Sequence, residues 1–125
     1  EIIPQEAWIA GAGVGLLAVA VLIANNTRDI ATDRLVGKHT LSVRIGDRAS
    51  RILFTVCALV PFVAPAIYLV AYPGMIYTLF ALFGAIPAVV IMLWARTSRE
   101  MILALAITSL TALAYGVLMG VAFAF

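Results

Sequence analysis

Long apolar stretches alternate with short polar segments along this chain. Residues 7–27, 52–95 and 101–125 contain no charged side chain, and most of their positions are apolar. A bilayer core of about 30 Å needs roughly 20 helical residues, so the first and third stretches each predict one membrane span. The second stretch is long enough for two spans, and its Pro73-Gly74 pair is a turn signal that divides it. The pattern therefore predicts four transmembrane helices, at about residues 7–26, 52–70, 75–95 and 101–123.

The composition agrees with an all-α integral membrane protein. Hydrophobic residues make up 65% of the 125 residues and charged residues 11%. Soluble domains average about 45–50% apolar and about 25% charged residues, so this chain lies outside that class. Backbone polar groups in lipid must be satisfied within their own segment, which makes a helix the expected form of each span.

Glycines and prolines predict how two of the spans pack and bend. Gly11, Gly13 and Gly15 are expected to give the first helix one smooth face that suits close helix packing. Pro61 and Pro65 are expected to bend the second helix.

The basic residues predict how the spans are oriented. With four spans, the segments 25–51 and 96–100 lie at the same membrane face, and they contain all eight Lys and Arg residues of the chain. The positive-inside rule then predicts that both segments are cytoplasmic in a multi-pass protein of the cell membrane. The net charge of +2 reflects this topology, and nucleic acid is not expected as a partner.

The segment 25–51 holds most of the candidate chemistry. The first helix has no terminator before Asp33, so Asn25, Asp29 and Asp33 are expected to line one helix face. Two carboxylates and an amide oxygen form an all-oxygen surface that suits Mg²⁺, which takes one or two carboxylates together with substrate phosphates. The same spacing predicts mild repulsion between the two carboxylates, which a cation would relieve.

Basic side chains flank this oxygen surface and could hold phosphate oxygens, either as forks or as point charges. They are Arg28, Arg34, Lys38 and Arg44. Gly37 permits a turn that would bring Lys38 back over the site. The alternative is a juxtamembrane loop whose acidic and basic residues pair with each other and with lipid headgroups in a non-catalytic four-helix module. Loss of arginines would then weaken membrane association, whereas Asn would be tolerated at both aspartates.

The segment 25–46, NNTRDIATDRLVGKHTLSVRIG, resembles the second aspartate-rich motif of the UbiA superfamily of intramembrane prenyltransferases. Within that superfamily it is most similar to the branch that prenylates 1,4-dihydroxy-2-naphthoate in menaquinone biosynthesis. The matching features are the paired Asn, the Arg-Asp, a second Asp four residues on, and the Gly-Lys-x-Thr-Leu. Outside the motif the resemblance is one of helix number and spacing.

The resemblance implies a site and a reaction. Asp29 and Asp33 would be the catalytic, metal-binding carboxylates, with Asn25 supporting the metal. The residues that would contact the diphosphate are Asn26, Arg28, Lys38 and Arg34. With Mg²⁺ as cofactor, the family moves a polyprenyl group from an allylic polyprenyl diphosphate to an aromatic acceptor. With 1,4-dihydroxy-2-naphthoate the product would be demethylmenaquinone, and diphosphate and carbon dioxide would be released. Another acceptor, such as 4-hydroxybenzoate, is the alternative within the family.

The resemblance also implies that this chain is incomplete. The family has two aspartate-rich motifs that face each other across a bundle of about nine helices. Residues 1–125 would be the C-terminal half of that domain, with 25–51 as its catalytic loop, and the N-terminal half of the same protein would be the missing partner. The chain starts at Glu1 without a basic region or cleavage pattern, so no signal peptide is expected and it reads as part of a longer protein. Alone it is expected to be inactive.

Overall fold

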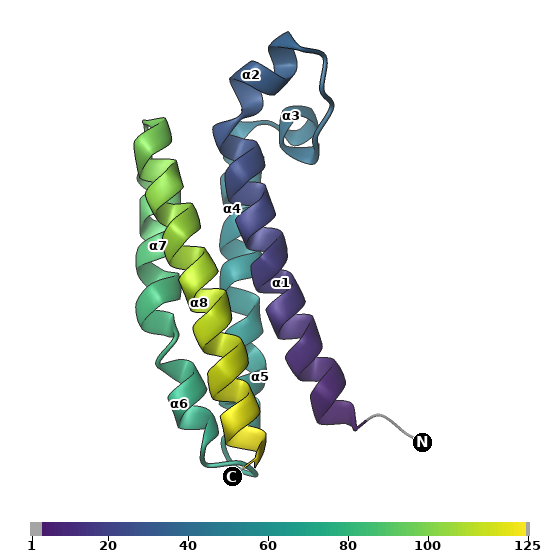
Figure 1. The fold of residues 1–125 in the computed structure, drawn as a ribbon, viewed down its shortest axis with the longest axis vertical. Helices are drawn as coiled ribbons and strands as arrows, with labels where there is room; N and C mark the ends of the chain where they lie inside the picture. Colours follow the sequence, from purple (N-terminus) through teal and green to yellow (C-terminus); the bar gives the residue numbers. More distant parts are fainter. Residues whose placement is uncertain (1–3, 125) are drawn as a thin grey trace.

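The computed structural model describes residues 4–124, which form an all-helical bundle (Figure 1). Four helical segments are long and apolar enough to cross a membrane, judged by length and composition. Their bounds are Gln5–Arg28, Asp47–Tyr68, Met75–Trp94 and Ser98–Ala124. The predicted all-α fold with four transmembrane helices is therefore confirmed, and the ends differ from the predicted ones by a few residues.

Two of the four segments are interrupted, and two short helices lie between the first and the second segment. The first segment is α1 and the fourth is α8. Between α1 and α4, α2 extends beyond the end of the bundle and α3 lies beside the ends of α1 and α4 (Figure 1). The helices are α1 (Gln5–Arg28), α2 (Ile30–Leu35), α3 (Leu41–Ile45), α4 (Asp47–Leu59), the 3₁₀ turn η1 (Val60–Phe62), α5 (Val63–Tyr68), α6 (Met75–Leu79), α7 (Leu82–Trp94) and α8 (Ser98–Ala124). Both segments that carry Lys and Arg lie at the end of the bundle where α1 ends and α8 begins.

The core lies where α8 packs against α1 and α7 and where α1 packs against α4. Its largest fully buried side chains include Leu17, Phe54, Met92 and Tyr115. The outward faces are also apolar, as Phe83 shows with 78% of its surface exposed. Apolar residues on both the inside and the outside are expected of a bundle whose solvent is lipid.

The predicted common face of three glycines on α1 is wrong. Gly13 is buried, and a Cβ atom there would overlap the side chain of Tyr115 on α8. Gly11 and Gly15 are exposed, and apart from the adjacent backbone of α1 no atom lies within 4 Å of where their Cβ atoms would be. Residues two apart on an α-helix are turned by about 200°, so Gly13 must face away from the other two.

Where we expected prolines to bend the second segment, its α-helix is interrupted by the 3₁₀ turn η1, which contains Pro61. Pro65 has no N–H group, so the Pro61 carbonyl cannot receive the α-helical hydrogen bond from the residue four positions later. The hydroxyl of Tyr115 donates a hydrogen bond to that carbonyl oxygen at 2.6 Å. The Tyr115 ring also makes an edge contact with Phe62, with ring centroids 5.3 Å apart. One buried side chain of α8 thus supplies the donor that the proline removes from the second segment.

Candidate functional site

The two aspartates lie where α1 passes into α2. Asp29 separates the two helices, with φ −96° and ψ 8°, and Asp33 lies in α2. The Asp29 N–H donates to the Asn25 carbonyl at 3.2 Å, and the Asp33 N–H donates to the Asp29 carbonyl at 2.8 Å. The helical hydrogen bonds therefore continue across the junction, and these three residues follow one another one turn apart, as the spacing predicts. The break at Asp29 is the one departure from the continuous helix that we expected.

Arg28 binds both Asn25 and Asp29 through its guanidinium group. Its Nε donates to Asp29 Oδ1 at 3.0 Å, and its Nη2 donates to Asp29 Oδ2 at 3.2 Å and to Asn25 Oδ1 at 2.6 Å. The Arg28 and Asp29 side chains are 28% and 34% exposed, so water still reaches the pair. A ligand of Asp29 or Asn25 must therefore displace Arg28 or bind beside it.

The pKa of Asp29 is lowered from its ordinary value. The main cause is the hydrogen bond from Arg28, which partial burial opposes. The positive charges of Arg28 and Lys38 lower this pKa further. The charge of Lys38 thus acts on the Asp29 carboxylate, in line with the turn on Gly37 that was expected to bring Lys38 back over the site.

Asp33 is the less satisfied of the two carboxylates. Its Oδ2 is buried, and no residue in the described part of the chain gives it a hydrogen bond. A buried carboxylate oxygen without a donor or a cation is costly, so this atom lacks an interaction that the described residues do not supply. Within residues 4–124, no group of three or more His, Cys, Asp or Glu side chains could enclose a metal ion. Two carboxylates and one amide fit Mg²⁺, which binds through few protein ligands and substrate phosphates.

The turn after α2 presents Lys38. Gly37 has φ +75°, a left-handed conformation that favours glycine. The Gly37 N–H donates to the Arg34 carbonyl at 3.3 Å, and the Lys38 N–H donates to the Asp33 carbonyl at 2.8 Å. These two bonds make the Schellman motif that ends a helix on glycine. Lys38 itself is exposed at this end of the bundle.

The other predicted site residues are less engaged with the aspartates. Asn26 is half-buried on α1. Arg34 is exposed, and its Nη2 lies 3.5 Å from the Val43 carbonyl oxygen, where it contacts α3. Arg44 is exposed in the last turn of α3.

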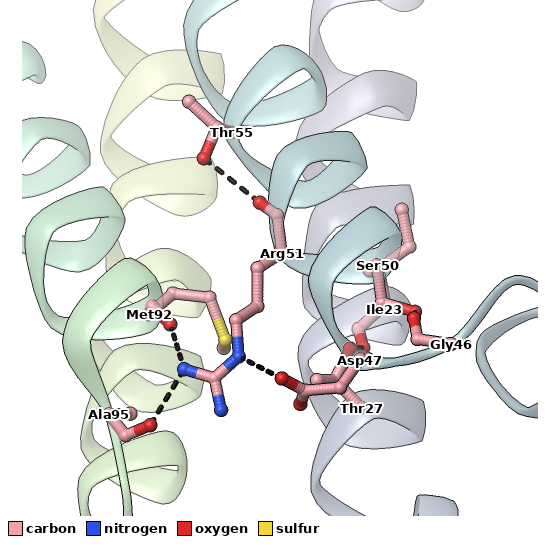
Figure 2. Close-up of polar contacts among 9 residues, drawn as sticks. All are labelled: Ile23, Thr27, Gly46, Asp47, Ser50, Arg51, Thr55, Met92 and Ala95. Atoms are coloured by element: carbon pink, nitrogen blue, oxygen red, sulfur yellow. Dashed lines mark hydrogen bonds and ion pairs between the residues drawn. The ribbon is translucent and has the colours of Figure 1, made fainter.

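From the sequence, Arg51 is expected only to contribute to the positive charge of the cytoplasmic face, whereas in the structure it joins two helices (Figure 2). Its Nη1 donates to the carbonyl oxygens of Met92 and Ala95, both at 2.7 Å, and its Nε donates to Asp47 Oδ2 at 2.9 Å. The first turns of α4 are thereby tied to the end of α7, where backbone carbonyls lack helical partners. The Asp-x-x-x-Arg spacing could have predicted the ion pair between Asp47 and Arg51. No sequence pattern predicts the contacts of Arg51 with Met92 and Ala95.

Comparison with known proteins identifies related sequences. The model of the UbiA prenyltransferase family matches residues 1–101. The protein named 1,4-dihydroxy-2-naphthoate octaprenyltransferase in Mycobacterium tuberculosis is 36% identical over 111 residues, which are 89% of this chain and 38% of that protein. The protein with this name in Haemophilus influenzae is 53% identical over 51 residues, 38% of this chain and 17% of that protein. Its namesake in Escherichia coli is 60% identical over 37 residues, 30% of this chain and 12% of that protein.

These matches cover well under half of each relative's length. No solved structure matches the chain significantly.

Proposed function

The chain belongs to the UbiA prenyltransferase family, and we propose that it is the C-terminal half of a 1,4-dihydroxy-2-naphthoate polyprenyltransferase. The reaction would transfer a polyprenyl group from an allylic polyprenyl diphosphate to 1,4-dihydroxy-2-naphthoate, giving demethylmenaquinone, diphosphate and carbon dioxide. The observation that carries the proposal is the buried Asp33 oxygen without a donor, one helical turn from Asp29 and just beyond the end of the candidate membrane span α1. The names of the curated relatives support the choice of acceptor.

Asp33, Asp29 and the Asn25 amide are the residues that would hold Mg²⁺, which the family generally uses. Bound Mg²⁺ would neutralise negative charge that develops on the departing diphosphate. Arg28 donates hydrogen bonds to Asp29 and Asn25. When substrate binds, Arg28 would give up these hydrogen bonds and donate to diphosphate oxygens instead.

Lys38 and Arg34 would hold the outer diphosphate oxygens. Both side chains are exposed at the end of the bundle, beside the turn on Gly37, so they can reach a ligand that enters from water. Their positive charges favour the leaving diphosphate in the transition state. Asn26, half-buried on α1, would add an amide contact.

The arrangement of charge suits a substrate with a lipid tail and an anionic head. All eight Lys and Arg residues fall at the end of the bundle that carries Asp29 and Asp33. By the positive-inside rule, we propose that this end is cytoplasmic in the cell membrane. The diphosphate would then bind at the cytoplasmic face while the isoprenoid chain stays in the apolar layer.

The rest of the longer protein would complete the site. The matched part is 38% of the Mycobacterium tuberculosis relative, so a protein of similar length would continue well beyond this chain. We propose that the N-terminal half supplies the facing aspartate-rich motif and most of the cavity, and that residues 1–125 are inactive alone.

Turnover by the full-length protein tests this proposal. Asp29→Asn and Asp33→Asn should each abolish Mg²⁺-dependent prenyl transfer, whereas Glu100→Gln, at an exposed carboxylate at the start of α8, should not. Offering 1,4-dihydroxy-2-naphthoate and 4-hydroxybenzoate in parallel decides the acceptor. Near-normal turnover by both Asn variants would reject the site. If loss of the arginines weakened membrane association and the protein had no affinity for diphosphate or Mg²⁺, the lipid-binding module would be the better explanation.

A further inference from the structure

A carboxylate lies at the end of the bundle opposite Asp29 and Asp33. It belongs to Glu6 in the first turn of α1, and Tyr72 reaches it from the turn between α5 and α6. The Tyr72 hydroxyl donates a hydrogen bond to Glu6 Oε1 at 3.4 Å. The pKa of Tyr72 is raised, mainly by the negative charge of Glu6 and further by burial. The Glu6 carboxylate thus acts on Tyr72 as a nearby negative charge.

Residues 4–124 provide no cation for this carboxylate. All eight Lys and Arg residues lie in the segments 25–51 and 96–100, at the other end of the bundle. The ion pairs of the described residues join Arg28 to Asp29 and Arg51 to Asp47, so neither involves Glu6. The Glu6 side chain is half-buried, and a carboxylate partly removed from water favours a nearby positive charge.

Three aromatic rings lie beside Glu6. The Tyr72 and Phe123 rings meet edge to face with centroids 5.2 Å apart, and Tyr68 lies 6.2 Å from the first and 6.4 Å from the second. A hollow of about 310 Å³ is lined by Pro4, Glu6, Ala7, Tyr72 and Phe123. Aromatic faces attract cations through the ring quadrupole. A carboxylate and aromatic rings that line one hollow therefore suit an ammonium group, which can donate to the carboxylate while its stem contacts the rings.

We propose that this hollow binds the ammonium headgroup of an aminophospholipid such as phosphatidylethanolamine. The hollow lies where the candidate membrane spans α1 begins and α8 ends, which is the level of lipid headgroups. Tyr72 and the exposed Trp8 are residue types that occupy this interface. The positive-inside rule disfavours Lys and Arg in short loops at this face, so a lipid headgroup is the cation available at this depth. The inference does not rest on the proposed function, since the hollow lies far along the bundle from the aspartates.

Native mass spectrometry of the detergent-solubilised full-length protein tests the proposal. The protein is titrated with phosphatidylethanolamine and with N-acetyl phosphatidylethanolamine of the same acyl chains, which lacks the ammonium charge. The first lipid should bind more tightly, and Glu6→Gln should remove most of this preference, a change of roughly threefold to tenfold in Kd. Glu100→Gln, at an exposed carboxylate at the opposite end of the bundle, is the matched control and should keep the preference.

Variants at Tyr72 separate the ring from its hydroxyl. Tyr72→Phe keeps the ring and should bind phosphatidylethanolamine nearly as the parent does, whereas Tyr72→Leu should bind it more weakly. Equal Kd values for the two lipids, or the same preference in Glu6→Gln as in Glu100→Gln, would overturn the proposal. A carbodiimide crosslink from Glu6 to a lysine elsewhere in the full-length protein would also overturn it, because the occupant would then be the protein itself. None of these measurements depends on prenyl transfer, so a negative result leaves the proposed function intact.

Discussion

Tyr115→Phe tests how α8 compensates for a proline in the second membrane segment. The substitution removes one oxygen atom and keeps the ring, so the edge contact with Phe62 is retained. The lost hydrogen bond joins the Tyr115 hydroxyl to the Pro61 carbonyl at 2.6 Å, in a fully buried part of the bundle. Because Pro65 has no N–H group, that carbonyl has no α-helical donor to replace the hydroxyl.

A buried acceptor without its donor costs about 1–3 kcal/mol, so the free energy of unfolding should fall by that amount. Unfolding of the detergent-solubilised full-length protein measures the change. Tyr77→Phe is the matched control, since Tyr77 is 57% exposed and removal of its hydroxyl should change the stability by no more than about 0.5 kcal/mol.

A double-mutant cycle with Pro65→Ala separates this mechanism from a general loss of packing. Alanine at position 65 restores an N–H group that can bond to the Pro61 carbonyl. Tyr115→Phe should therefore cost less in the Pro65→Ala background than in the parent. Equal losses in the two backgrounds, or a loss no larger than that of Tyr77→Phe, would refute the reasoning.

Three further predictions concern the charged end of the bundle. Arg28→Gln should raise the pKa of Asp29 toward its ordinary value, measured by infrared titration of the carboxyl group; an unchanged pKa would contradict the assigned cause. Because the pKa of Asp29 is lowered in the folded protein, the ion pair stabilises the fold at pH values above the ordinary Asp pKa of about 3.8. The difference in stability between the parent and Arg28→Gln should therefore disappear as the pH falls through the lowered pKa. Gly37→Ala should destabilise the turn after α2 by about 1–2 kcal/mol, because Gly37 has a left-handed conformation that alanine adopts poorly. The loss should appear as faster amide exchange in this turn, and Gly37→Asn should cause a smaller loss. Arg51→Met should lower the free energy of unfolding by about 3 kcal/mol or more, and Arg51→Lys, with one donor nitrogen, should recover only part of it.

Much of the fold follows from the sequence because the membrane imposes simple rules. Charge-free stretches of sufficient length predicted the four spans, and Pro73-Gly74 marked the turn between the second and third. The turn on Gly37 was also predictable, because a glycine after a short helix is the usual residue for a left-handed cap. Local rules that depend on one residue type or on length were therefore sufficient for these features.

Other features depend on contacts between distant parts of the chain. The prediction that Gly11, Gly13 and Gly15 share one helix face was wrong, because residues two positions apart lie on opposite sides of a helix with 3.6 residues per turn. The ties from Arg51 to the end of α7 and from Tyr115 to Pro61 join residues far apart in sequence, which no local pattern reveals. The candidate site is predictable only in part. The spacing of Asp29 and Asp33 on one helix face is a local pattern and was predicted, whereas contacts with distant residues were not.

Binding of an unreactive polyprenyl diphosphate analogue to the full-length protein tests the central claim most directly, namely that Asp29 and Asp33 hold a metal-bound diphosphate. Isothermal titration with and without Mg²⁺ should show that tight binding requires the metal. Asp33→Asn should weaken it by about 1.5–3 kcal/mol, or roughly tenfold to a hundredfold in Kd, as expected for one charged contact. Glu100→Gln should bind as the parent does. Binding that ignores Mg²⁺, or equal Kd values for Asp33→Asn and Glu100→Gln, would contradict the account.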